Sequence, residues 1–134
     1  MMLSNIEKDR ELSLYMIECM NKPFKWGEQD CCLFAVRWIE KITGNKYLPD
    51  VIPWHSARTA LKYISEHYGT LEEELDKQLT PIDANLAVDG DVTVVDGTMF
   101  IFSNIYIVSV GYHGLDMLPR SKANKAWQVN LKRD

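Results

Sequence analysis

Two adjacent cysteines follow an aspartate in the segment Asp30-Cys31-Cys32, just before a run of apolar residues with helical spacing. A cysteine in the first turn of a helix lies near unpaired backbone N–H groups and the positive end of the helix dipole, and both favour its thiolate. The thiolate is the nucleophile of cysteine hydrolases. Asp30 acts in the opposite sense, because a neighbouring carboxylate disfavours a second negative charge. Cys31 is therefore a candidate nucleophile, and the alternative is that both cysteines are small apolar core residues.

A cysteine nucleophile works best with a general base within hydrogen-bond reach, and histidine is the usual base. The sequence has three histidines. His55 and His67 flank a predicted helix and are expected to be surface or packing residues. His113 lies in a turn that contains glycine, from which its ring can reach the end of a neighbouring strand. His113 is the candidate base for Cys31, and the alternative is an exposed turn residue.

The cysteines and histidines do not have the spacing of a metal site, because there is no C-x-x-C pair and the histidines are far apart. We therefore expect neither a metal nor another cofactor. The number of cysteines is odd, at three, and adjacent cysteines rarely pair because the geometry is strained. Free thiols in a cytosol-like compartment are expected.

The chain of 134 residues is expected to form a single domain over residues 1–134, with an ordinary hydrophobic fraction of 46%. Its net charge of −4 disfavours nucleic-acid binding, which normally needs a basic patch. The N-terminus lacks the apolar core of a signal peptide, and no apolar run is long enough to span a membrane. The protein is expected to be made and folded in the cytoplasm.

Apolar spacing and capping residues predict four helices in the first part of the chain. They cover about residues 5–20, with a capping box at Ser4, then 30–44, 56–69, and a short acidic helix within 70–79. The second is apolar over most of its circumference and is expected to be the central helix. From Val88 onward, short β-branched and aromatic runs predict an antiparallel meander. Helices followed by a sheet indicate an α+β fold.

Several single residues have expected places in this fold. Cys19 is expected in the core, and Trp127 is expected to pack on the sheet. Trp54 and Tyr47 lie in a proline-rich loop and are expected to be exposed, where they could contribute to a partner surface. Trp26 precedes the central helix, and two roles remain open for it: a wall of a substrate groove or a cover over the core.

The segment F-x-W-G-x-x-D-C-C-L-F-A, residues 24–35, is followed by G-D-V at Gly90 to Val92 and by A-W-x-V at Ala126 to Val129. This pattern resembles the NlpC/P60 superfamily of cysteine peptidases and amidases. It resembles more specifically a family of tailed-phage and prophage proteins of unknown function that is related to that superfamily. The resemblance implies a papain-like fold, with N-terminal helices and a central cysteine-bearing helix packed on a C-terminal antiparallel sheet.

The resemblance places the superfamily's nucleophile at Cys31, and Cys32 is expected to be buried and inert. The superfamily's catalytic histidine would begin the second strand after G-D-V. Thr98 and Met99 occupy that place, and neither can accept a proton from a thiol. General-base help is typically worth ~10²–10⁴ in rate. Unless His113 replaces the missing base, the resemblance implies a catalytically degenerate domain.

Three functions are compatible with this sequence. The first is a catalytically degenerate NlpC/P60-like protein that serves as a structural or assembly component of a phage tail tip, with other tail proteins as partners. The second is an active cysteine hydrolase that cuts peptidoglycan, with Cys31 as nucleophile and His113 as a displaced base. The third is a phage protein that binds a host protein. These functions imply the host cytoplasm during synthesis and, for a tail component, the virion tail.

Overall fold

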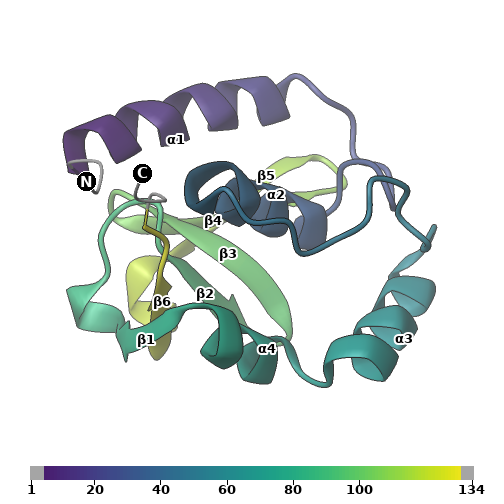
Figure 1. Ribbon diagram of the computed structural model, residues 1–134. Coiled ribbons are helices and arrows are strands. Elements are labelled where there is room, and N and C mark those ends of the chain that lie inside the picture. The colour runs from purple at the N-terminus through teal and green to yellow at the C-terminus, as the bar shows by residue number, and fades with distance from the viewer. Residues whose placement is uncertain (1–4, 131–134) are drawn as a thin grey trace.

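The computed structural model describes residues 5–130 and shows an α+β fold with helices and a six-stranded antiparallel sheet (Figure 1). The described helices are α1 (Asn5–Met20), α2 (Cys31–Thr43), α3 (Ala57–Tyr68) and α4 (Leu71–Gln78). The strands are β1 (Thr80–Asp83), β2 (Val92–Val95), β3 (Thr98–Ser103), β4 (Tyr106–Gly111), β5 (Gly114–Pro119) and β6 (Lys125–Gln128). Short 3-10 turns cover Ala84–Leu86 and Arg120–Lys122. The four predicted helices are confirmed, whereas the cap predicted at Ser4 lies outside the described residues.

Helix α2 is the central helix, as its apolar circumference predicts. It begins after the N-cap Asp30 and ends at Gly44, whose φ of 77° is the left-handed conformation that glycine adopts readily. One side of α2 contacts β3 and β4. Another side packs on α1, where the Tyr15 ring lies 5.6 Å from Phe34 and 5.5 Å from Trp38 between centroids. Figure 1 shows α1 extending across the top of the molecule above α2.

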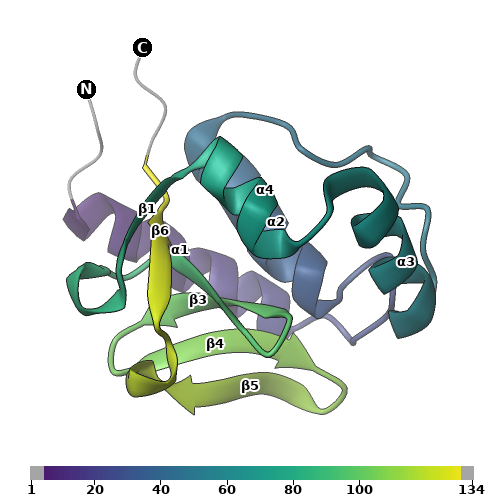
Figure 2. The same cartoon turned by 90° about the horizontal axis from the view of Figure 1, so that it is seen from below.

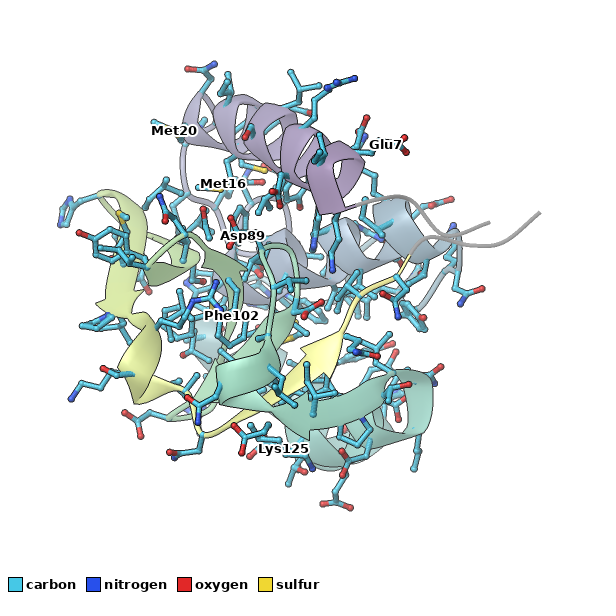
Figure 3. The ribbon with its side chains drawn as sticks, turned by 90° about the vertical axis from the view of Figure 1, so that its left-hand side faces the viewer. Glu7, Met16, Met20, Asp89, Phe102 and Lys125 are labelled. Atoms are coloured by element: carbon cyan, nitrogen blue, oxygen red, sulfur yellow. The ribbon has the colours of Figure 1, made fainter. Side chains whose placement is uncertain are left out.

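The sheet has the order β1-β6-β2-β3-β4-β5, and Figure 2 shows β3, β4 and β5 side by side, with β5 at the outer edge. One face carries the main core, in which Ile101, Val108 and Trp127 pack with the side chains of α1 and α2. The other face holds a smaller cluster that includes Phe102, labelled in Figure 3, and Ile107. Both faces are therefore covered, and Trp127 packs on the sheet as predicted.

Strand β1 is absent from the sequence prediction, which places no strand between the short acidic helix and Val88. In the structure, β1 is an edge strand that pairs with β6, and Pro81 lies opposite Trp127. Proline is compatible with an edge strand because one side of that strand needs no backbone donor. Pairing between segments more than 40 residues apart leaves no local signal in the sequence.

The G-D-V segment joins distant parts of the chain. Asp91 is buried, and its carboxylate accepts hydrogen bonds from Lys8 Nζ at 2.7 Å and from the backbone N–H of Val129 at 3.1 Å. The carbonyl of Gly90 accepts a hydrogen bond from the Trp38 indole at 2.7 Å. These bonds connect α1, α2, the start of β2 and the end of β6. The motif therefore has a structural role, and it contains none of the groups around Cys31.

Candidate functional site

Asp30 holds the start of α2 in place through three hydrogen bonds. One carboxylate oxygen accepts the backbone N–H of Leu33 at 2.9 Å, which is the N-cap bond. The other oxygen accepts the backbone N–H of Gly27 at 2.8 Å and the Trp54 indole N–H at 2.9 Å. Asp30 is fully buried, at 0% exposure. A buried carboxylate with three donors is a structural anchor, and it sets the position of Cys31 directly after it.

The loop before the helix packs against the loop that follows it. Gly27 has a φ of 84°, and a Cβ at this position would overlap the carbonyl oxygen of Trp54. Trp54 itself is buried, at 2% exposure, and Tyr47 is partly buried. The expectation that Trp54 is exposed is therefore wrong. Trp54 is buried because its indole N–H donates a hydrogen bond to the buried Asp30 carboxylate. The proline-rich composition of its loop does not predict this contact.

Cys31 is partly exposed and lines a cavity of about 530 Å³. The cavity lies between the start of α2, helix α3, the start of α4 and the β2–β3 hairpin. Its lining residues are Trp26, Cys31, Cys32, Ala57, Ala60, Leu61, Ile64, Ser65, Gly69, Thr70, Leu71, Glu72, Asp96, Gly97, Thr98 and Met99. We call this space the Cys31 cavity. Trp26 forms part of its wall and donates its indole N–H to the Tyr112 hydroxyl at 3.1 Å.

The surroundings of Cys31 disfavour its thiolate. Burial and the nearby carboxylate of Asp30 raise the pKa of the Cys31 thiol, and Asp116 contributes in the same direction. The backbone N–H groups at the start of the helix lower this pKa, but they do not outweigh burial. The predicted contribution of the helix start is therefore present, but it is smaller than the combined effect of burial and Asp30 on this pKa.

The other two cysteines lie in the core. Cys32 is buried, and burial raises the pKa of its thiol above the ordinary value. This agrees with its expected place as a buried residue. Cys19 is also buried and packs in the main core, as predicted. All three cysteines are free thiols.

Thr98 and Met99 line the Cys31 cavity at the start of β3, and Met99 is buried. None of the described residues that line this cavity is a histidine. His113 is exposed at the turn between β4 and β5. It lines a different cavity of about 830 Å³, together with residues from the end of α1. No hydrogen bond joins Cys31 to an imidazole within residues 5–130, so the pairing of Cys31 with His113 stays a prediction.

The other two histidines lie at the surface, in agreement with their expected roles. His55 is exposed before α3. His67 is exposed, and its ring stacks on Tyr63 with centroids 3.9 Å apart. Within the described part of the chain, no three histidine, cysteine or acidic side chains gather in a way that could hold a metal ion. None of the helices in residues 5–130 combines the length and apolar character that a bilayer crossing requires.

The sequence prediction of the site omitted residues that come from outside the cysteine motif. Leu61 and Ile64 come from α3, Glu72 from the first turn of α4, and Asp96 from the β2–β3 hairpin. The Asp-Gly pair at Asp96 is a recognisable hairpin-turn signal. Its position beside a helix that begins more than 60 residues earlier depends on the packing of the whole domain.

Fold and site together define an α+β domain whose central helix begins with a partly exposed cysteine, in a cavity that no histidine of residues 5–130 lines. A family model covers residues 5–129 of the chain, which therefore belongs to the family described as a domain of unknown function (DUF6950). Neither the curated proteins nor the solved structures include a match to the chain.

Proposed function

We propose that this protein is a papain-like, NlpC/P60-related domain that has lost catalysis and acts as a structural or assembly component of a phage tail tip. The W-G-x-x-D-C opening supports the relationship. So does the arrangement in which the cysteine-bearing helix α2 contacts strands β3 and β4 of a later antiparallel sheet. The proposed partners are other tail proteins.

The main support for a loss of catalysis is the absence of a histidine base among the side chains that line the cavity around Cys31 within the described residues. Where the resemblance requires a histidine, Thr98 and Met99 line the cavity, and they provide no base. Burial and Asp30 also raise the pKa of the Cys31 thiol. A hydrolase needs the thiolate, so both features reduce the rate of nucleophilic attack.

One observation favours the second candidate, an active cysteine hydrolase. Cys31 is partly exposed in a cavity of about 530 Å³ with Trp26 in its wall, which is room enough for a peptide side chain. In that case His113 would act as a displaced base and peptidoglycan would be the substrate. The raised pKa of the Cys31 thiol places this candidate second.

Thiol reactivity separates the two candidates. The rate at which iodoacetamide alkylates Cys31 is measured between pH 6 and pH 10 by peptide mapping, in the wild type, His113→Ala and the control His67→Ala. We expect slow labelling at neutral pH, an increase only in the alkaline range, and the same profile in all three proteins. Fast labelling at neutral pH that His113→Ala abolishes and His67→Ala preserves would establish the hydrolase instead.

Phage production tests the structural role. We expect Cys31→Ser to leave the titre of infectious particles unchanged and the protein to co-purify with virions in fixed proportion to other tail proteins. A titre that falls with Cys31→Ser would support catalysis. A protein that is absent from virions and co-purifies with a host protein from infected cells would support the host-binding alternative.

A further inference from the structure

The Cys31 cavity has an apolar wall built from side chains of two helices and one strand. Leu61 and Ile64 of α3, Leu71 of α4 and Met99 of β3 all line it. Leu61 is 64% exposed, although its helical position groups it with the apolar face of α3. The Leu61 side chain therefore adds an exposed apolar contact to the wall of the cavity.

Two carboxylate side chains line the same cavity, and a third lies beside it. Glu72 and Asp96 line it, and Glu73 approaches Gly69, another lining residue, with its carboxylate 3.7 Å from a Cβ built there. Glu73 accepts a hydrogen bond from Thr70, whereas Glu72 and Asp96 have no ion pair within the described residues. No lysine or arginine is among the described lining residues. The cavity is therefore apolar inside and negatively charged at its rim.

We propose that the Cys31 cavity binds a lysine or arginine side chain presented by a partner protein, a proposal that rests on the proposed loss of catalysis at this site. Such a side chain has an apolar stem and a charged head. The stem packs on Ile64, Leu71 and Met99, and the head reaches Glu72 and Asp96. The Trp26 ring in the wall offers an additional contact, because a cation is attracted to an indole face.

Other occupants fit the cavity less well. A purely apolar side chain would fill the interior but would leave the rim carboxylates without partners as it displaces their water. An acidic side chain would be repelled by the carboxylates. A cation with an alkyl stem satisfies both parts of the cavity.

A second, smaller cavity adjoins the Cys31 cavity and offers a place for a neighbouring residue of the same peptide. It has a volume of about 220 Å³ and shares Cys32, Ile64, Leu71 and Met99 with the Cys31 cavity. Its further lining includes Leu48 and Leu75, which makes it largely apolar. A segment with a basic residue near an apolar residue can occupy both cavities at once.

Binding of peptide pools tests this proposal. Four pools of fluorescein-labelled pentapeptides carry a central Lys, Arg, norleucine or Glu between randomised flanks, and fluorescence anisotropy measures their affinity for the full chain. We expect the Lys and Arg pools to bind best and the Glu pool least, with the preference decreasing as salt is added. Equal affinity for the four pools, a preference for Glu, or no binding by any pool would overturn the proposal.

Variants locate the binding site. Glu72→Gln and Asp96→Asn should each lower the affinity for the Lys and Arg pools about three- to fivefold, as expected for a partly exposed ion pair. Glu66→Gln, a matched change at an exposed α3 carboxylate outside the cavity, should have no effect. Ala57→Leu, at an exposed lining position, should weaken all pools because it narrows the cavity. An equal loss of affinity in Glu66→Gln and Glu72→Gln would show that the basic side chain does not bind in the Cys31 cavity.

The outcome is distinguishable from a failure of the proposed function. If the protein cleaves the bound peptides through Cys31, the loss of catalysis is wrong, while the charge dependence still identifies the cavity as the binding site. If no cleavage occurs and the charge changes have no effect, only the binding proposal fails.

Discussion

The buried carboxylate of Asp30 provides the sharpest test of how this site is built. Asp30→Ala would remove the acceptor of three hydrogen bonds, from Gly27, Leu33 and the Trp54 indole. Each buried donor left without a partner costs about 1–3 kcal/mol. Because the bond to Gly27 is only partly buried, we expect a total loss of about 3–5 kcal/mol in the free energy of unfolding. This is a large part of the ~5–15 kcal/mol that stabilises an ordinary domain.

Asp30→Asn separates this anchor from a simple helix cap. At an ordinary N-cap, asparagine is about as good as aspartate. Here one side-chain oxygen faces two N–H donors and the other faces one, so the amide NH₂ of asparagine must point at a donor in either orientation. We therefore expect Asp30→Asn to lose at least about 2 kcal/mol, since it leaves one or two buried donors unpaired.

Urea denaturation followed by circular dichroism measures both variants. Ser56→Ala is the matched control, because Ser56 caps α3 through its side chain and has no comparable set of buried partners. It should lose only about 1 kcal/mol. The usual effect of a neutral surface change on the free energy of unfolding is within about 0.5 kcal/mol. An Asp30→Asn variant that differs from the wild type by no more than this would contradict the inference that three donors need both carboxylate oxygens.

Three further predictions concern the loop, the core and the response to acid. Gly97→Ala should reduce the free energy of unfolding by about 1–2 kcal/mol, from left-handed backbone strain alone. Gly27→Ala should reduce it by at least about 1 kcal/mol more, because the added Cβ overlaps a backbone carbonyl; urea denaturation measures both variants. Lys8→Met should reduce the free energy of unfolding by about 3–5 kcal/mol because it leaves the Asp91 carboxylate without its buried cation; an unchanged midpoint would contradict this. Burial opposes the charged form of Glu40, but the hydrogen bonds to its carboxylate outweigh burial and lower its pKa. Glu40 therefore stabilises the folded state above its unfolded pKa of about 4.3, and this stabilisation is lost as the pH falls through the folded pKa. The stability difference between the wild type and Glu40→Gln should therefore be present at pH 7 and disappear in acid, as denaturation at a series of pH values would measure.

The helices and their ends were predictable because the signals that determine them are local. Asp30 and Gly44 bound α2, and Ser56 and Gly69 bound α3, where the structure has the corresponding caps. Capping depends on hydrogen bonds between residues three or four positions apart, which a short segment of sequence contains. The place of Cys31 at the start of the central helix was predictable for the same reason.

The strands of the meander and their pairing with adjacent strands were also predictable, but the long-range pairing of β1 with β6 was not. Alternation and turn residues mark β2, β3 and β4, each of which follows its neighbour through a short turn. Strand β1 and its pairing with β6 connect segments more than 40 residues apart. The pairing of distant strands depends on which surfaces remain uncovered after the helices pack, and a local sequence pattern does not predict those surfaces.

The sequence by itself determined the helical elements, the α+β class and the position of a cysteine at a helix start. Only the tertiary structure decided what surrounds that cysteine. Trp54 is buried on Asp30, Glu72 and Asp96 come to the cavity from two other elements, and His113 lines a different cavity. The physical reason is that burial and charge act over a few ångströms in space, whichever distance separates the residues along the chain. The pKa of the Cys31 thiol, on which its chemistry depends, is therefore a property of the folded domain.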